Sequence, residues 1–308
     1  MQKLTAATLK GNWATLLLPI NDNDTINYPL LTEEIEYLIA AGVDGIYSNG
    51  TAGEFHNQTE DEFDQINQLL SEKCRSANMR FQIGAGHSSP IISLKRVKRC
   101  IHLKPDAIQV ILPDWVVANH TEQIAFLQGI AYNSHGIPLV LYNPPHAKTV
   151  LKPKEFGELK TLIPQVIGIK VPYGDRDWIA GMKKYTAHLS VFVPGHLLAS
   201  GVCSEMASGA YSNIACINAI AAQKWWNQMQ TDMDAALELE QRILQFFKEC
   251  ISPYQQKGYS NPALDKFLAA VGGYVQINTR LRWPYQFISN DDVLSVRKRA
   301  QHIIPEFF

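Results

Sequence analysis

Eight short runs rich in valine, isoleucine and leucine recur along the first 220 of the 308 residues, with helical patterns between them. Such runs are typical of strands buried on both faces of a parallel sheet, because the connecting helices cover those faces. The predicted strands are residues 13–18, 43–48, 80–84, 107–112, 138–142, 166–171, 190–193 and 210–214. The chain is therefore predicted to be an α/β protein built from repeated βα units.

The segments between these runs carry helix signals. Apolar residues from Leu31 to Ile39 recur at helical spacing, and Gly42 follows as a C-terminal stop. Thr59 and Glu62 have the spacing of a capping box. Two further helix starts are predicted at Thr121 and at Pro153, a first-turn proline.

Eight strands alternating with helices favour a closed (β/α)8 TIM barrel over an open doubly wound sheet, which usually has fewer strands. The open sheet is the second interpretation, although no G-x-G-x-x-G follows the first strand. After residue 220 the patterns become helical, over 231–249, 262–271 and 291–302. We therefore predict a barrel domain in residues 1–220 and a small C-terminal helical extension in 221–308.

The composition limits the classes of partner. A formal net charge of −1 provides no long-range field that would attract nucleic acid or an anionic membrane, so a small-molecule partner is expected. Five dispersed cysteines without C-x-x-C, and nine histidines without ligand spacing, predict no metal site. Neither a signal peptide nor a long apolar span is recognisable, so we expect a cytoplasmic protein.

In a TIM barrel the active site lies at the C-terminal ends of the strands, where polar residues are the first candidates. Lys170 ends the sixth predicted strand. A lysine pointing into a barrel loses solvation, which lowers its pKa, and the neutral amine can attack a ketone. The alternative is a lysine that extends to solvent or pairs with Asp175.

Two further candidates lie at strand ends. Tyr142 ends the fifth predicted strand, next to that of Lys170, and its phenol could carry protons or simply fill volume. The segment 49–54 contains two glycines, which allow a sharp turn whose N–H groups could bind a substrate carboxylate. A glycine-containing βα turn is weak evidence by itself.

Together these motifs resemble the dihydrodipicolinate synthase and N-acetylneuraminate lyase family of pyruvate-type class I aldolases and dehydratases. The sequence GTAGE at 50–54 is similar to the family's G-T-T-G-E, YNPP at 142–145 to Y-N-x-P, and GIK at 168–170 to G-x-K. The resemblance implies a cofactor-free enzyme and a homotetramer of tight dimers. It also implies catalytic roles for Lys170 as the Schiff-base lysine, Tyr142 as the proton shuttle and Thr51 as a ligand of the carboxylate.

The resemblance further implies substrate contacts, and some of them depart from the family pattern. Ala52 replaces the second threonine and leaves only a backbone N–H. Trp115 stands where dihydrodipicolinate synthases have the second tyrosine of a proton relay, and indole cannot replace it. Trp115 suggests instead an apolar pocket wall. The other expected contacts are His146, Lys148, Gly195, His196 and Tyr211.

These departures predict a Schiff-base lyase that acts on pyruvate or a 2-keto-3-deoxy type 2-oxo acid. Dihydrodipicolinate synthase or N-acetylneuraminate lyase activity is the first alternative. A non-catalytic 2-oxo acid sensor is the alternative of another class. The substrate and the choice between aldol chemistry, dehydration and deamination stay open.

Overall fold

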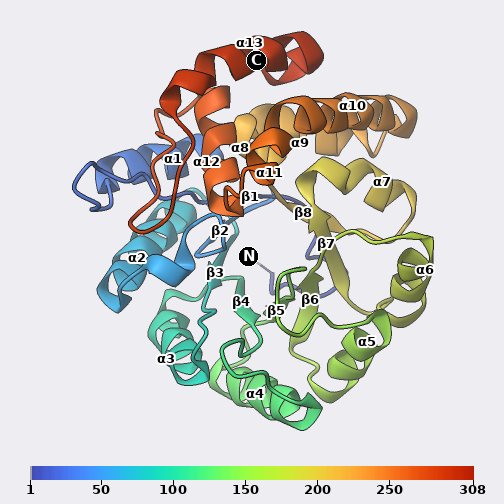
Figure 1. The fold of residues 1–308 in the computed structure, drawn as a ribbon. Coiled ribbons are helices and arrows are strands. Elements are labelled where there is room, and N and C mark those ends of the chain that lie inside the picture. The colour runs from blue at the N-terminus through green and yellow to red at the C-terminus, as the bar shows by residue number, and fades with distance from the viewer. Residues whose placement is uncertain (1) are drawn as a thin grey trace.

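The computed structural model describes residues 2–308. Its centre is a closed barrel of eight parallel strands, each paired with the next along the chain, and β8 pairs with β1 to close the ring (Figure 1). The strands are β1 Gly11–Thr15, β2 Gly45–Ser48, β3 Phe81–Gly84, β4 Ala107–Ile111, β5 Leu139–Tyr142, β6 Val166–Lys170, β7 Ser190–Pro194 and β8 Gly209–Ser212. The predicted TIM barrel is confirmed, and the closing pair excludes the open sheet.

Helices surround this barrel (Figure 1). Along the barrel they are α1 Tyr28–Ala40, α2 Glu60–Ser76, α3 Pro90–Cys100, α4 His120–Asn133, α5 Pro153–Leu162, α6 Arg176–Tyr185, α7 Leu198–Cys203, α8 Ile214–Ile217 and α9 Ala219–Gln228, with short turns η1 Phe55–Asn57, η2 Ile101–Leu103 and η3 Gly195–Leu197. Helix α9 packs against β1, so the ring of barrel helices continues to Gln228.

Most element boundaries follow the sequence signals. The capping box of Thr59 and Glu62 is present, and Pro153 begins α5. The predicted start at Thr121 is wrong by a short step, because Asn119 is the N-cap and its side chain accepts the N–H of Glu122 at 3.1 Å. The first strand ends at Thr15 rather than at residue 18, although residues 16–18 remain buried.

The last part of the chain is helical, as predicted. It comprises α10 Met233–Phe246, the π-helical turn η4 Phe247–Ile251, α11 Ser252–Gln256, α12 Asn261–Gly272, η5 Asn290–Asp292, α13 Val293–Ile303 and η6 Pro305–Phe307. These helices gather on the side of the barrel that carries β1, β2 and β8 (Figure 1). No helix within residues 2–308 is both long and apolar enough to cross a bilayer.

A buried ion pair joins this C-terminal helical region to the barrel. The Nζ of Lys266 on α12 lies 2.6 Å from Oε1 of Glu54, which follows β2, and both side chains are almost fully buried. Lys266 also donates to the carbonyl of Arg280 at 2.6 Å. An ion pair inside a protein requires such additional partners, because both charges have lost their hydration. Helix α12 is therefore fixed against the loop after β2.

Candidate active site

A cavity of about 450 Å³ opens at the C-terminal end of the barrel, and Lys170 at the end of β6 reaches into it. The parallel register places Tyr142 of β5 directly opposite Lys170. The adjacent strands thus bring the two predicted groups together at one level of the barrel. The opposite wall of the cavity comes from the C-terminal helical region, with Leu244, Phe247, Ile251, Asp265 and Leu268 among its residues.

Aromatic rings surround the amine of Lys170. Its Nζ lies 4.3 Å from the ring centre of Tyr142, 5.1 Å from that of Tyr47 and 5.3 Å from that of Tyr211. Nζ also donates to the hydroxyl of Tyr47 at 3.3 Å. Burial lowers the pKa of Lys170 to about 8, against an opposing effect of the carboxyl of Asp265. A substantial share of this amine is therefore neutral near physiological pH.

The alternative of a lysine paired with Asp175 does not hold. The carboxyl of Asp175 caps α6 instead, where it accepts the N–H of Trp178 at 2.9 Å. The side chain of Lys170 lies inside the barrel, so its partners come from the strands around it.

The phenol of Tyr142 lies beside the loop that follows β2. The hydroxyl of Thr51 donates to the hydroxyl of Tyr142 at 3.5 Å. Burial raises the pKa of Tyr142, and the hydrogen bond from Thr51 lowers it in part. The phenol is thus protonated at neutral pH and can donate a proton to an oxygen that develops negative charge.

In the loop of residues 49–54, the positive φ angles do not fall on the two glycines. Asn49 and Glu54 adopt positive φ angles of 52° and 50°, whereas Gly53 is required because a Cβ there would lie 2.8 Å from the carbonyl oxygen of Leu16. Within residues 2–308, the backbone N–H groups of Thr51 and Ala52 have no hydrogen-bond acceptor. Both residues line the cavity.

The sequence of residues 8–303 matches the profile of the dihydrodipicolinate synthetase family. The chain belongs to this family. A 4-hydroxy-tetrahydrodipicolinate synthase of Roseobacter denitrificans is 25% identical over 250 residues, which are 78% of this chain and 82% of that enzyme. One from an Exiguobacterium species is 32% identical over 182 residues, which are 58% of this chain and only 59% of that enzyme.

Solved structures share the fold. A prophage protein of the dihydrodipicolinic acid synthase family from E. coli K12, in complex with pyruvate, superposes with a TM-score of 0.83 at 19% identity and covers 96% of this chain and 98% of its own. The N-acetylneuraminate lyase of Fusobacterium nucleatum gives 0.82 at 19% identity, with 96% and 99% covered. Members of the dihydrodipicolinate synthetase family are lyases, and this chain is a lyase of that family.

The sequence patterns did not reveal one acidic group of the cavity that contains Lys170. Asp265 lies on α12 and lines the cavity with Lys170. Burial raises the pKa of its carboxyl to about 7, and the amine of Lys170 opposes this shift. A signal was present in the sequence, because Asp265 interrupts the apolar residues of the predicted helix over 262–271. Periodicity alone could not show that this helix meets the barrel.

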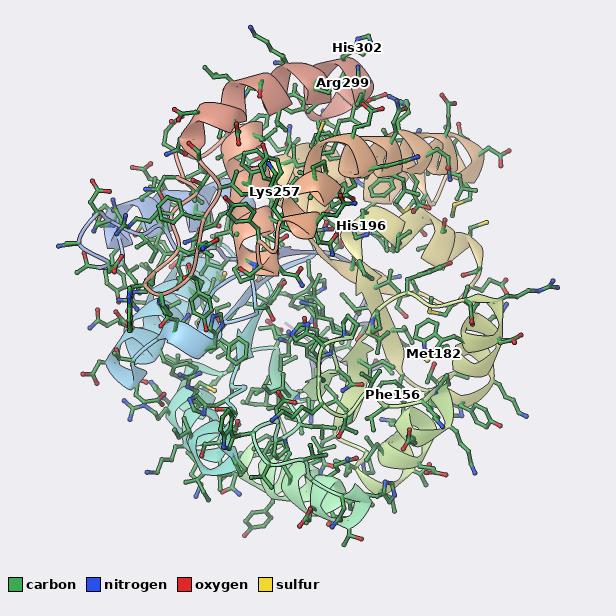
Figure 2. All side chains as sticks on the ribbon, viewed as in Figure 1. Phe156, Met182, His196, Lys257, Arg299 and His302 are labelled. Atoms are coloured by element: carbon green, nitrogen blue, oxygen red, sulfur yellow. The ribbon has the colours of Figure 1, made fainter. Side chains whose placement is uncertain are left out.

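Two other predicted residues lie at the same cavity. Tyr211 is buried in the barrel and its hydroxyl donates to Oε1 of Gln82 at 2.7 Å. His196 stacks on Phe247 of the π-helical turn, with ring centres 4.7 Å apart, and burial lowers its pKa to about 4. In Figure 2 it lies between the barrel and the C-terminal helices. Gly195 is buried and is not part of the cavity wall, and a Cβ there would lie 2.8 Å from Oδ1 of Asn213.

The three remaining predicted residues lie elsewhere. His146 lines a neighbouring cavity of about 610 Å³, which also contains Tyr142 and Thr51 in its wall. Trp115 is 80% exposed and forms no wall of either cavity. Lys148 donates to the carbonyl of Trp115 at 2.9 Å and covers its ring. The prediction of Trp115 and Lys148 as pocket residues is thus not supported, because the loops after β4 and β5 pair with each other at the surface.

No group of three histidine, cysteine, aspartate or glutamate side chains that could hold a metal ion occurs in the described chain, residues 2–308.

Proposed function

We propose that this family member is a Schiff-base lyase, which condenses Lys170 with the C2 carbonyl of a 2-oxo acid and makes or breaks a bond at C3. The supporting observation is the amine of Lys170, which is enclosed by tyrosine rings in a cavity large enough for a small acid and has a pKa lowered to about 8. A neutral amine attacks a ketone, whereas an ammonium group has no free electron pair.

The loop after β2 provides a place for the substrate carboxylate. Thr51 and Ala52 line the cavity, their N–H groups have no acceptor within residues 2–308, and the hydroxyl of Thr51 donates to that of Tyr142. Hydrogen bonds from N–H groups to an ionised acceptor are stronger than those between neutral groups. A 2-oxo acid whose carboxylate is held there would share one cavity with the amine of Lys170. Ala52 offers only its backbone, so this contact tolerates the missing second hydroxyl.

The proposed sequence begins with attack of the neutral Lys170 on C2. Tyr142 transfers a proton to the oxygen of the carbinolamine, and loss of water yields the iminium ion. The positive nitrogen then withdraws electrons from C3. Either a bond between C3 and its substituent breaks or a proton leaves C3, and an enamine forms in both cases. The prophage protein of the same fold was solved in complex with pyruvate, a 2-oxo acid, which supports this class of substrate.

We propose a 2-keto-3-deoxy sugar acid or a related hydroxylated 2-oxo acid as the substrate rather than aspartate semialdehyde as a co-substrate. Trp115 stands at the position of a relay tyrosine in the synthases that this chain resembles, and its indole is exposed and has no acidic proton of useful pKa. A panel of 2-keto-3-deoxy acids, assayed for release of pyruvate or a semialdehyde, distinguishes these substrates. Turnover of aspartate semialdehyde with pyruvate would contradict the proposal.

Reduction with borohydride in the presence of pyruvate tests the Schiff base. We expect a covalent adduct on Lys170, detected by peptide mass spectrometry. A Lys170→Ala variant should fold and lose turnover by a factor on the order of 10⁴ or more, because the covalent step has no substitute. An unmodified wild-type protein, or an active variant, would refute the mechanism. Binding of pyruvate without an adduct and without proton exchange would favour the sensor.

A further inference from the structure

Asp265 occupies an unusual position on α12. Its carboxyl lines the cavity of Lys170, while the next residue, Lys266, points away and pairs with the buried Glu54. Within residues 2–308 the carboxyl of Asp265 makes no hydrogen bond and no salt bridge, even with Lys170. The residue is only partly buried, because its side chain faces the cavity. The carboxyl is therefore accessible to a substrate in the cavity.

The surroundings of Asp265 contain few groups that titrate near neutral pH. The ionisable side chains that interact electrostatically with it are Lys170, Tyr47, Tyr142 and Cys216, and His196, Tyr211 and Lys248 also line the cavity. Burial raises the pKa of Tyr47, of Tyr142 and of the thiol above their ordinary values, so these three groups keep their protons. Once Lys170 is bonded to a substrate, the carboxyl of Asp265 is the member of this set with a pKa near neutrality.

A general acid–base group works best when its pKa lies near the working pH and when it is within reach of the reacting atoms. Tyr142 reaches the amine from β5, whereas Asp265 reaches the cavity from α12. The two groups thus approach the substrate from different elements. Because Tyr142 lies beside the amine, it is the nearer candidate for the oxygen lost from C2, and Asp265 is the further carboxyl in the cavity for the atoms beyond C2.

We propose that Asp265 is a second catalytic residue of this lyase, which transfers a proton between the C4 hydroxyl and C3 of a 4-hydroxy-2-oxo acid held on Lys170. The inference rests on the proposed function. In the cleavage direction, the carboxylate of Asp265 takes the C4 hydroxyl proton and the electron pair of that O–H bond forms the C4 carbonyl. The C3–C4 bond breaks, its electron pair forms C2=C3, and the iminium π pair moves to nitrogen.

The same proton then returns to the substrate. The carboxylic acid of Asp265 protonates C3, the enamine becomes an iminium ion again, and water releases pyruvate from Lys170. The carboxyl ends as it began, and water is the only other reactant. In the absence of an aldehyde, the reverse of the last proton transfer exchanges the methyl protons of pyruvate with solvent.

Pyruvate alone is therefore a sufficient probe. Borohydride trapping of pyruvate reports imine formation, and loss of the methyl signal in D₂O, followed by NMR, reports proton transfer at C3. For Asp265→Asn we expect trapping within about threefold of wild type and exchange that is slower by about 100-fold or more. Asp234→Asn, an exposed aspartate on α10, is the matched control and should retain both.

The outcomes separate the two proposals. A wild-type protein that traps no pyruvate would refute the Schiff-base function, and the inference with it. Wild-type trapping together with unchanged exchange in Asp265→Asn would overturn the inference alone. Equal losses of trapping and exchange would also overturn it, because Asp265 would then act only on the charge of Lys170. Thermal unfolding checks that the variant is folded, and Asp265→Ser replaces it in the same comparison if it is not.

Discussion

The amine of Lys170 is surrounded by tyrosine rings and donates to a phenol hydroxyl rather than to a carboxylate, and this environment keeps the amine reactive. A cation over an aromatic ring gains about 0.5–2 kcal/mol, which is less than the hydration that a buried ammonium loses. A carboxylate in direct contact would hold the proton on the amine far more strongly. The structure instead has Asp265 in the same cavity without a salt bridge, so the pKa of Lys170 stays near 8.

This environment predicts a pH-dependent stability. The pKa of Lys170 is about 8 in the folded chain and about 10.4 in the unfolded chain. Between these values the unfolded chain binds more protons, so folding becomes more favourable as the pH rises from about 8 to about 10.4. We expect the free energy of unfolding of wild type, minus that of Lys170→Met, to increase over this window in urea titrations. A difference that falls there would contradict the lowered pKa.

Two tyrosines of the cavity should respond differently to loss of the hydroxyl. Tyr142→Phe removes the proposed proton donor, so we expect kcat to fall by about 10²–10⁴ with little change in stability. Tyr211→Phe removes a buried hydrogen bond to Gln82 and should cost about 1–3 kcal/mol of stability, with a smaller effect on kcat. Steady-state kinetics and thermal unfolding of both variants test this contrast. If Tyr211→Phe lowered kcat more than Tyr142→Phe did, Tyr211 and not Tyr142 would be the proton donor.

Among the helices and strands, sequence patterns predicted those elements whose signals lie within a few residues of one another. The eight strands and the capping box of Thr59 follow from apolar runs and from cap residues, which act within a few positions. The register that sets Tyr142 opposite Lys170 follows once the sheet is closed. Asp265 and the exposed position of Trp115 could not be predicted in this way, because each depends on where distant segments pack.

The contact between α12 and the loop after β2 should be essential for stability. Lys266→Met leaves the carboxylate of Glu54 buried without its partner, which costs about 3–5 kcal/mol. We expect a correspondingly lower midpoint in urea unfolding. The double variant Glu54→Gln with Lys266→Met removes both charges and should recover part of the loss. Equal stabilities of the single and double variants would show that the pair contributes little.

For the whole molecule, the question is whether the barrel is independent of the helices that follow it. We predicted a barrel domain in residues 1–220 and a helical region in 221–308, and α9 continues the barrel ring to Gln228. The homotetramer implied by the family resemblance also stays a prediction, since one chain is described.

A chain that ends at Gln228 should fail to fold. It would lose Lys266, so Glu54 would be buried unpaired, and it would lose the apolar side chains of α10 and α12 that cover the core. We expect no cooperative thermal transition by circular dichroism, while the full chain should unfold in one step. A fragment that melts cooperatively would show that the barrel is a separate folding unit.

The π-helical turn Phe247–Ile251 contains one more residue per turn than an α-helix would use. Deletion of a single codon within it would restore regular α-helical winding and move the side chains of the turn itself, because a π-turn absorbs its extra residue locally. Phe247 and Ile251, which line the cavity from this turn, would then shift, while the later residues Ser252 and Gln255 would keep their places. A change in the length of this turn would thus alter the cavity wall, and with it the substrate range of this lyase, without any substitution in the barrel.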